Sequence, residues 1–362
     1  MKKLFKKVMK IFLSFLTAFL FSCSQPSLAV SSEVSGDFEI TMLDVGQGLA
    51  VLIKADDHYL LYDGGGRETS SYVVSYLQEH GVDALDYVIV SHYDEDHLAG
   101  VIGVMNVFPV LQLLCPDYEP DTWLYDSFRD MEKEKNISKV FVSAQDSFAF
   151  GEAEIRILGP VTCDHEEENN NSVVAEVSYG SFSILLTGDA EKEEEEEILS
   201  LYSDLHADVM TAAHHGSSTS SSSAFLDAVD PSYVLISCGK GNDYGHPHAS
   251  VMNALKQRKV MMFRSDLQSE VTIWYYGGKV NVSTYPCDVW DAGEIPERSA
   301  AIQEYTEAEG GTEYVLNTHT MKFHLPECTG IKDMNEKNRL VVITAREELI
   351  SSGYEPCGNC RP

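Results

Sequence analysis

A seven-residue run rich in metal-binding side chains limits most strongly what this chain can fold into. Residues 87–91 are apolar and β-branched, which predicts a short buried strand, and the run Ser-His-Tyr-Asp-Glu-Asp-His occupies positions 91–97. A divalent metal needs several nitrogen and oxygen donors at about 2.0–2.2 Å. One tight loop at the end of a rigid strand supplies several such donors. The alternative interpretation is a polar loop with two incidental histidines.

Three further segments carry donors directly after short apolar runs: Asp189 after 182–187, His214 and His215 after 207–213, and His246 after 233–237. A single histidine in such a place is often only a hydrogen-bonded core residue. The joint occurrence of four segments, each following a predicted strand, predicts one metal site that is assembled from several strand ends.

The rest of this region predicts short strands with helices between them. Apolar or alternating runs bounded by glycine turns predict strands at 38–43, 49–53, 59–62, 87–91, 153–158, 173–178, 182–187, 207–213, 233–237, 259–263 and 271–275. Helical spacing of apolar residues predicts helices at 69–80, 96–106, 191–202, 221–229 and 249–257. This order indicates layered α and β structure. The glutamate run 193–197 is interpreted as the solvated face of a helix start, where its charge is favourable.

The first residues are typical of an export signal. A basic stretch over residues 1–10 precedes an apolar run over 11–21 that is too short to span a bilayer. Residues 20–23 resemble a lipoprotein signal, so we expect a signal at 1–22, lipidation of Cys23 and a serine-rich linker at 23–37. The alternatives are cleavage after Ala29 and an uncleaved anchor. All of them place the remainder outside the cytoplasm, as a cell-surface lipoprotein or a secreted protein.

The charge of the chain opposes broad, non-specific binding to nucleic acid. The formal net charge is -31, and the first thirty residues hold five lysines and no acids. The chain without them is therefore more acidic still, and such a surface repels polyanions at long range. This charge is therefore evidence against a nucleic-acid substrate.

Residues 38–285 resemble the metallo-β-lactamase superfamily, and most of all the hydrolase domain of the ComEC-type DNA-uptake competence proteins. The matching stretches are 43–48, 91–97, 170–174, 186–189, 214–217 and 244–247. The resemblance implies a four-layer αββα sandwich of the α/β class. The superfamily usually has a histidine where Asp94 stands and another near Asn170 and Asn171. The ComEC-like branch shares both departures.

That resemblance implies the residues of a two-metal site. The metal ligands would be His92, Asp94, Asp96, His97, Asp189 and His246, completed by one of His214 and His215, of which we favour His215. The other histidine, His214, would donate a proton to the leaving group or bind phosphate. Asp96 would also orient a metal-activated hydroxide, which two Zn²⁺ or Mn²⁺ ions supply at neutral pH. Asp63 resembles the carboxylate that orients ligands; the alternative is a simple turn cap.

The C-terminal residues predict a second, structural metal site. After a predicted linker at 286–311, the segment 312–362 contains His324 and Cys328 in H-x3-C spacing and Cys357 and Cys360 in C-x2-C spacing. Two close pairs of such donors fit one tetrahedral zinc ion. A segment of about fifty residues has too small an apolar core to fold alone, and a bound metal ion would stabilise it. The alternative is a disulfide between two of the cysteines.

The same segment resembles the small zinc-binding domain of the Ada DNA-repair protein, with histidine in place of the first cysteine. That resemblance implies contact with nucleic acid. However, the segment has six lysines and arginines against seven acids, so it carries no basic stripe. A purely structural zinc knuckle stays an open alternative.

These observations together predict an exported metal-dependent hydrolase, a phosphodiesterase or nuclease that acts on DNA. Its partners would be nucleic acid or another phosphodiester, and a membrane through the lipid anchor; no protein partner is evident. No other long apolar run exists, so this chain alone would not transport DNA. The alternatives are a phosphodiesterase for cell-wall or small phosphoesters and a non-catalytic surface-binding protein.

Overall fold

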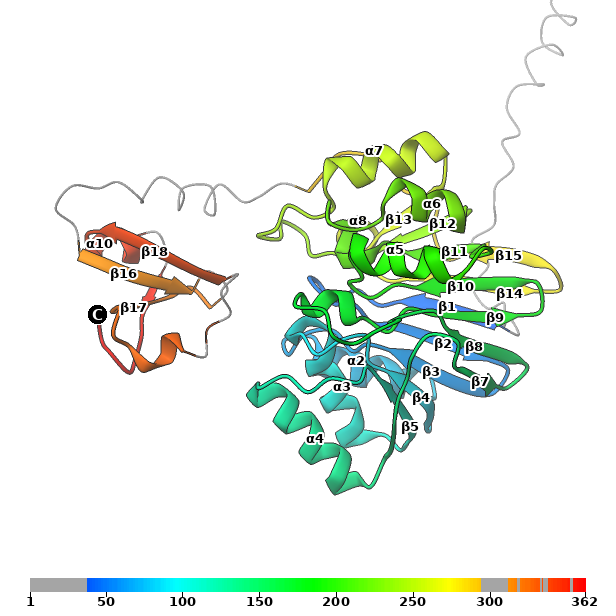
Figure 1. Cartoon of the computed structure of the whole chain (residues 1–362), viewed down its shortest axis with the longest axis horizontal. Helices are drawn as coiled ribbons and strands as arrows, with labels where there is room; N and C mark the ends of the chain where they lie inside the picture. Colours follow the sequence, from blue (N-terminus) through cyan, green and yellow to red (C-terminus); the bar gives the residue numbers. More distant parts are fainter. Residues whose placement is uncertain (1–37, 294–311, 318–319, 333, 335–337, 352–353) are drawn as a thin grey trace, which may run out of the picture. The chain divides into compact units, whose positions relative to one another are not determined.

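The computed structural model describes residues 38–293 and 312–362, except 318–319, 333, 335–337 and 352–353 (Figure 1). The predicted signal, Cys23, the linker at 23–37 and most of the linker at 286–311 lie outside the described residues. Within the described ranges, no helix is both long enough and apolar enough to cross a membrane.

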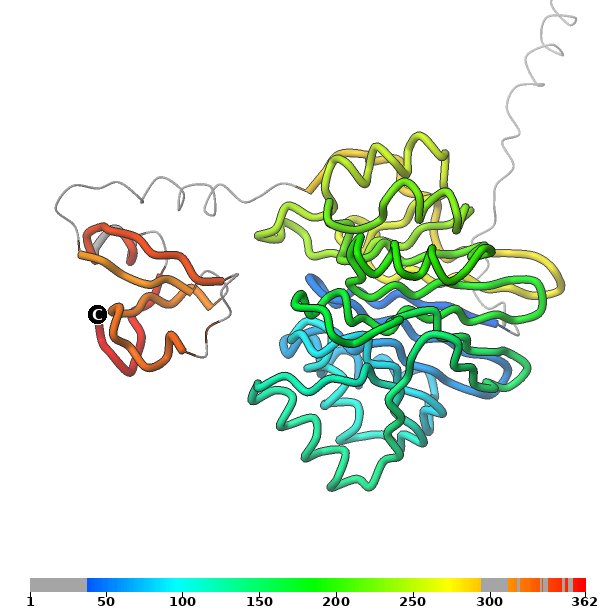
Figure 2. Tube along the Cα trace, in the orientation of Figure 1, coloured from blue at the N-terminus to red at the C-terminus, as the bar shows by residue number. Residues whose placement is uncertain are grey.

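The first sheet has eight strands, in the order β15-β14-β1-β2-β3-β4-β5-β6. Its strands are β1 (Phe38–Met42), β2 (Val51–Ala55), β3 (His58–Tyr62), β4 (Leu85–Ile89), β5 (Val110–Cys115), β6 (Ser138–Phe141), β14 (Val271–Tyr276) and β15 (Lys279–Val282). The neighbours from β3 to β6 are parallel. The Cα trace in Figure 2 returns at β14 to lie antiparallel beside β1, so segments far apart in the sequence share one sheet.

The second sheet has seven strands, in the order β13-β12-β11-β10-β9-β8-β7. Its strands are β7 (Ser147–Phe150), β8 (Ala153–Ile157), β9 (Ala175–Tyr179), β10 (Phe182–Leu186), β11 (Val209–Thr211), β12 (Tyr233–Ile236) and β13 (Met261–Arg264). The neighbours from β10 to β13 are parallel. Ligand sites form outside the carboxyl ends of parallel strands, and both sheets contain such ends.

Three apolar clusters hold the layers together. Between the sheets, alternate residues such as Ile40 and Ile53 of the first sheet and Val177 and Ile184 of the second are fully buried. The outer face of the first sheet is covered by α2 (Ser70–Glu79), α3 (Glu95–Val107) and α4 (Trp123–Lys135). The outer face of the second is covered by α5 (Lys192–Leu201), α6 (Ser223–Val229) and α7 (Ala249–Arg258). Figure 1 shows these helices on the two outer sides, which confirms the αββα sandwich.

Each strand and helix predicted in this domain corresponds to an element of the structure. The segment 107–152, for which the sequence predicts no element, contains β5, α4, β6 and β7. The helix α8 (Ser265–Gln268) and the strand β15 are also unpredicted. The short helices η1 (Glu168–Asn171) and η2 (Ala213–Gly216) lie in loops.

The glutamate run differs from its prediction as a solvated face. Glu194 and Glu195 are fully buried on the inner side of α5. The Glu195 carboxylate accepts hydrogen bonds from the backbone N–H groups of Ser221 (2.5 Å) and Ser222 (2.9 Å) at the start of α6. The run therefore has both exposed and buried members. The buried Glu195 supplies hydrogen-bond acceptors for backbone N–H groups at the N-terminus of α6.

The described part of the predicted linker packs on the main domain. Cys287 is buried in the cluster beneath α6 and α7, with Trp290 against it. The Cys287 N–H donates to the Met262 carbonyl (2.7 Å), and the Gly293 N–H to the Pro247 carbonyl (2.9 Å). The sequence predicts a linker here because the segment contains proline and charged residues. Only two of its apolar side chains, Cys287 and Trp290, pack against the domain, which is too few to form a recognisable pattern.

The C-terminal segment folds around a separate sheet in the order β18-β16-β17-β19. Its elements are β16 (Thr312–Asn317), β17 (Lys322–His324), η4 (Thr329–Ile331), β18 (Arg339–Thr344), α10 (Arg346–Ser351) and β19 (Glu355–Pro356). Six buried side chains form its main apolar cluster, including Tyr314, Phe323 and Tyr354. This core is small, which agrees with the need for an additional staple.

Candidate metal centre

The loop after β4 brings the first donors to the carboxyl end of the first sheet. His92 and His97 are fully buried, and His97 lies in the first turn of α3. The loop before β2 contacts the first turn of α3, where the Leu49 N–H donates to the Asp96 carbonyl (3.2 Å). A β-carbon at Gly48 would overlap that carbonyl oxygen, so glycine is required at this close approach.

Asp63, at the end of β3, orients this loop. Its buried carboxylate accepts hydrogen bonds from the Ser91 N–H (2.7 Å), the Ser91 hydroxyl (2.7 Å) and the His97 ring at Nδ1 (2.8 Å). In the neutral ring the His97 proton is therefore on Nδ1, and Nε2 is left bare. The Ser91 hydroxyl in turn lies 3.0 Å from Nδ1 of His92. Since that hydroxyl already donates to Asp63, it accepts from His92, whose Nε2 is bare as well.

The second sheet contributes Asp189 after β10 and His215 after β11. Oδ1 of Asp189 lies 3.2 Å from Nε2 of His97, and Oδ2 lies 3.5 Å from Nε2 of His215. Nδ1 of His215 lies 2.9 Å from the Ser237 carbonyl and must donate to it. Its bare Nε2 faces Nε2 of His97 at 3.3 Å and Oδ2 of Asp96 at 3.4 Å.

Two overlapping groups of donors result. The ligand atoms of His92, His97 and Asp189 all lie within 4.8 Å of one another, and so do those of Asp96, His97 and His215. Among the described residues, Nε2 of His92 and Oδ1 of Asp189 are buried without a hydrogen-bond partner. Such atoms each cost about 1–3 kcal/mol. Imidazole nitrogens and carboxylates that converge in this way fit a divalent cation.

The electrostatics of the cluster favour a bound cation. Burial raises the pKa of Asp189, but His215, His97 and His214 outweigh it and hold that pKa well below its ordinary value. Burial opposes ionisation of Asp96 too, yet the adjacent His215 and His97 leave its pKa lowered. Burial lowers the pKa of His97, but the charges of Asp189 and Asp63 raise it well above normal. Without a cation the ring would therefore hold a second proton at Nε2, and a bound divalent cation would take the place of that proton. Both carboxylates are therefore ionised at neutral pH.

Three of the predicted site residues lie beside these groups rather than in them. Asp94 precedes α3, one-third exposed, with Oδ2 3.9 Å from Nε2 of His92. The His246 ring centroid is 5.4 Å from that of His214 and 6.1 Å from that of His215. Burial, together with His215 and His214, lowers the pKa of His246 to about 3. Nε2 of His214 lies 3.8 Å from Oδ2 of Asp189.

Residues that were not predicted support the adjacent histidine pair. Nδ1 of His214 lies 3.2 Å from Oε1 of Glu191, and the Thr219 hydroxyl donates to the same oxygen (2.9 Å). The side-chain oxygen of Asn170 accepts from the Glu191 N–H (3.1 Å), and Ser172 accepts from the Asp189 N–H (3.2 Å). The Asn-Asn-Ser stretch thus shapes the loop around Asp189. Its match to the family motif at 170–174 was the one sequence feature that pointed to it.

The C-terminal domain contains a third group of donors. The ligand atoms of His324, Cys328, Cys357 and Cys360 lie within 4.8 Å of one another. Sγ of Cys328 is 3.4 Å from Nδ1 of His324 and 4.0 Å from Sγ of Cys357, so these two cysteines form no disulfide. Backbone N–H groups of Leu325 and Asn359 donate to Cys360 and Cys357. Four inward donors in this arrangement fit a closed tetrahedral zinc site.

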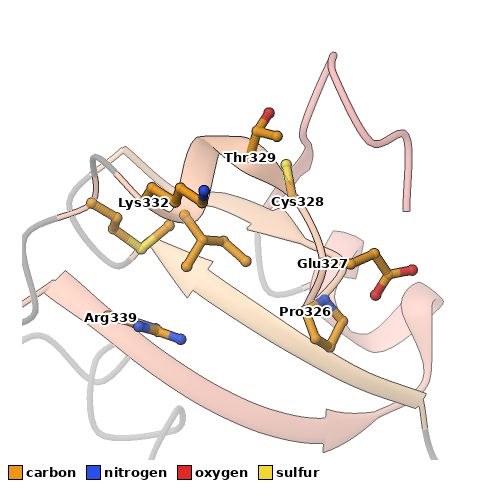
Figure 3. Close-up of a pocket in the computed structure, with 8 residues that line it drawn as sticks. Pro326, Glu327, Cys328, Thr329, Lys332 and Arg339 are labelled. Atoms are coloured by element: carbon orange, nitrogen blue, oxygen red, sulfur yellow. The ribbon is translucent and has the colours of Figure 1, made fainter.

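A cavity of about 410 Å³ adjoins this group (Figure 3). Cys328 forms part of its wall, together with the cationic side chains of Lys332 and Arg339 and the carboxylate of Glu327. The cavity therefore offers both signs of charge next to the cysteine cluster.

Comparisons with known proteins agree with this geometry. Residues 43–240 match the family model described as Metallo-beta-lactamase superfamily. The chain is 28% identical over 284 residues to "ComE operon protein 3" of Bacillus subtilis (strain 168), covering 73% of this chain and 36% of that protein. It is 30% identical over 233 residues to "Competence protein ComA" of Neisseria gonorrhoeae, covering 63% and 31%.

A third relative is "Recombination protein 2" of Haemophilus influenzae, 30% identical over 250 residues, with 68% of this chain and 30% of that protein covered. The chain thus spans about a third of the length of these curated relatives. The family match covers more than half of the chain and includes the donors from Asp63 to His215, and the resemblance predicted from the motifs is confirmed. The chain belongs to the metallo-β-lactamase superfamily.

Proposed function

We propose that this protein is a metal-dependent phosphodiesterase that cleaves DNA. The observation that carries the proposal is the pair of donor groups that share His97 at the carboxyl ends of the two sheets. When bound, divalent cations there supply Lewis acidity, which makes a water more acidic and stabilises charge on phosphoryl oxygens. The mixed imidazole and carboxylate donors suit Zn²⁺ or Mn²⁺.

The chain's own residues would position the reactants. Asp63 and the Ser237 carbonyl fix the rings of His97 and His215 with their bare nitrogens inward. Asp96 is one-third exposed and can accept a hydrogen bond from an attacking water. His214 donates from Nδ1 to Glu191, and as an imidazolium it would also hold a proton at Nε2 for the leaving oxygen.

Two observations support DNA as the substrate class. The relatives carry the names of competence and recombination proteins. In addition, the Arg67 guanidinium lies 4.4 Å from the ring centroid of Trp123, which is 58% exposed. The Arg67 N–H donates to Glu95 (2.9 Å), next to the metal-binding loop. An exposed aromatic ring with an adjacent cation suits a stacked base and its phosphate, despite the acidity of the whole chain.

The test uses purified protein without the predicted signal, incubated with single- and double-stranded DNA and with bis-p-nitrophenyl phosphate. Each substrate is tested with Mn²⁺, Zn²⁺ or EDTA. Asp189→Asn removes a carboxylate donor of the first group, and Asp126→Asn on the exposed face of α4 is the matched control. We expect metal-dependent DNA cleavage that Asp189→Asn abolishes and Asp126→Asn retains. Cleavage of the small ester alone would favour small or cell-wall phosphodiesters, and inactivity on all substrates would favour a binding protein.

We further propose one structural zinc ion in the C-terminal domain, held by His324, Cys328, Cys357 and Cys360. Contact between this domain and DNA is the finer hypothesis, which Lys332 and Arg339 at the adjoining cavity support. Loss of DNA affinity on deletion of 312–362, with hydrolysis of the small ester unchanged, would support it. Unchanged affinity would favour the structural role.

We also propose export, with Cys23 as the lipidated residue of a membrane anchor. The support is the basic and apolar order of residues 1–23. Mass spectrometry of the mature N-terminus in a bacterial host distinguishes the possibilities, since an acylated Cys23, an N-terminus at Val30 and an intact Met1 have different masses.

A further inference from the structure

The loop that carries His246 is held rigidly by one side chain. Asn242 accepts a hydrogen bond from the His246 N–H (3.0 Å) and donates to the His246 carbonyl (2.7 Å). The same amide nitrogen donates to the Gly239 carbonyl (2.8 Å). A β-carbon at Gly293 would overlap the His246 carbonyl, so the segment 286–293 packs closely against the loop. The position of the His246 backbone is therefore fixed by the surrounding fold.

Gln47 determines which nitrogen of that ring carries the proton. The Gly239 N–H can only donate, and it donates to Oε1 of Gln47 (3.2 Å). The other end of the amide is therefore the nitrogen, which lies 3.4 Å from Nδ1 of His246. An amide nitrogen donates and does not accept. Nδ1 of His246 must accept, and a protonated Nδ1 would place two donors face to face.

The resulting tautomer is opposite to that of the buried histidines in the metal-binding groups. In His97 and His215, Nδ1 donates to an oxygen and leaves Nε2 bare. In His246 the proton is on Nε2, which then has no lone pair for a metal ion. Among the described residues, no group bonds to this Nε2, and it is not one of the buried unpartnered atoms. This atom therefore keeps some exposed surface on the side of the donor groups, although His246 as a whole is only 4% exposed.

The surroundings of the ring indicate what kind of ligand it meets. The His246 ring lies 5.4 Å from that of His214 and is stacked on Tyr244 at 5.5 Å and 18°. Tyr244 is half-exposed, at 45%. A neutral N–H donor beside a cation-binding cluster, with an aromatic face open to solvent, suits an anionic oxygen on a substrate that reaches the cluster.

We propose that His246 is not a metal ligand but an Nε2–H donor that binds an anionic oxygen of the substrate, with Gln47 as the positioning residue that sets this tautomer. The identity of that oxygen as a phosphoryl oxygen rests on the proposed function. The tautomer and the absence of a metal bond do not depend on it.

Nitrogen NMR of full-length protein labelled at histidine tests the tautomer directly. The His246 signals are assigned by their loss in His246→Gln. We expect a protonated Nε2 and a bare Nδ1, and no coupling to ¹¹³Cd in the cadmium-loaded protein, whereas His97 and His215 couple. Gln47→Glu offers only acceptors, keeps the bond from Gly239 and should move the proton to Nδ1. A proton on Nδ1 in the unmodified protein, or coupling of His246 to cadmium, would overturn the proposal.

Binding of inorganic phosphate to the zinc-loaded protein tests the contact with the anionic oxygen. A lost hydrogen bond to a charged group corresponds to about a tenfold weaker affinity or more. His246→Ala should lose that much at unchanged zinc content, and His246→Gln, which keeps an N–H donor, should lose less. Equal phosphate affinity in the Ala variant, or no phosphate binding at all, would refute the contact. Failure to cleave any phosphodiester would refute the proposed function instead and leave the NMR result standing.

Discussion

Single hydrogen bonds decide the chemistry of this site, because each buried histidine has two nitrogens and only one can face a cation. Asp63, Ser91 and the Ser237 carbonyl each accept a ring proton at Nδ1. The Nε2 atoms of His92, His97 and His215 are thereby free to bind metal, and such orienting partners commonly affect metal affinity 10–100-fold.

Asp63→Asn should therefore weaken metal binding without removing any ligand. The amide can present only one acceptor to Ser91 and His97, and its NH₂ group would oppose a ring or backbone donor. We expect about a 10–100-fold lower affinity, measured by competition with a chelator. Asp126→Asn is the control for the loss of one carboxylate. Unchanged affinity in Asp63→Asn would show that Asp63 is only a turn residue.

Glu194 gives the protein a pH-dependent stability that is independent of the donor groups. Both of its carboxylate oxygens are buried without a hydrogen-bond partner among the described residues. Burial raises its pKa well above the ordinary value of 4.5. The folded state thus binds this proton more tightly than the unfolded state does. Its stabilisation is complete below about pH 4.5 and is lost as the pH rises through the folded pKa.

Glu194→Gln should remove this loss. The free energy of unfolding of the variant should exceed that of the unmodified protein at pH 8, and the difference should shrink toward pH 4.5. Denaturant titrations at several pH values measure it, with the exposed Glu196→Gln as the matched control. A difference independent of pH would mean that the pKa of Glu194 is the same in the folded and unfolded states, so that burial does not raise it.

At the scale of elements, two kinds of strand differ in how well the sequence predicts them. The strands that lead into the donor groups are predicted, whereas the strands at the edges of the sheets are missed. β10 and β12 are mostly apolar runs that are buried almost throughout, and β4 ends in the buried pair Val88 and Ile89, so their apolar sequences identify them. β6 and β7 are four-residue strands with exposed side chains, and α4 buries only Leu124, Tyr125 and Phe128 among polar neighbours. Such patterns resemble loops, because edge elements need little apolar surface.

The adjacent histidines show why the site could not be completed from sequence. His214 and His215 both adopt left-handed backbone conformations, with φ of 51° and 56°. This turn directs Nδ1 of His215 to the Ser237 carbonyl and Nδ1 of His214 to Glu191. Non-glycine residues rarely adopt that conformation, so no local pattern predicts which histidine faces the donor groups.

The N-terminal end of α4 is the element that should distinguish DNA from a small ester. Removal of a stacking ring costs about 1–3 kcal/mol per base. Trp123→Ala should therefore raise KM for single-stranded DNA about fivefold or more, with kcat/KM for bis-p-nitrophenyl phosphate unchanged. Tyr276→Ala is the matched control, since Tyr276 is 52% exposed at the end of β14. An equal effect of both variants would remove Trp123 from the binding surface.

At the scale of the whole molecule, the acidity of the chain and its proposed substrate place opposite demands on the surface. Long-range attraction to DNA is absent at a net charge of -31, so affinity must come from short-range contacts. Cations at the cluster, the Arg67–Trp123 pair and the C-terminal domain would supply them. Association should accordingly be slow, and its rate should increase with added salt rather than decrease.

The C-terminal domain should depend on its own metal ion while the αββα domain does not. Its apolar cluster of six residues is too small to be stable alone, and zinc binding to four donors contributes folding free energy directly. Cys357→Ser should lower the zinc content by one ion per chain and make 312–362 sensitive to protease, with the melting temperature of the main domain unchanged. Cys163→Ser, at a partly exposed cysteine of the main domain, controls for the loss of a thiol. Because neither cysteine belongs to the first two donor groups, a parallel loss of hydrolysis of the small ester would show that the two domains are energetically coupled.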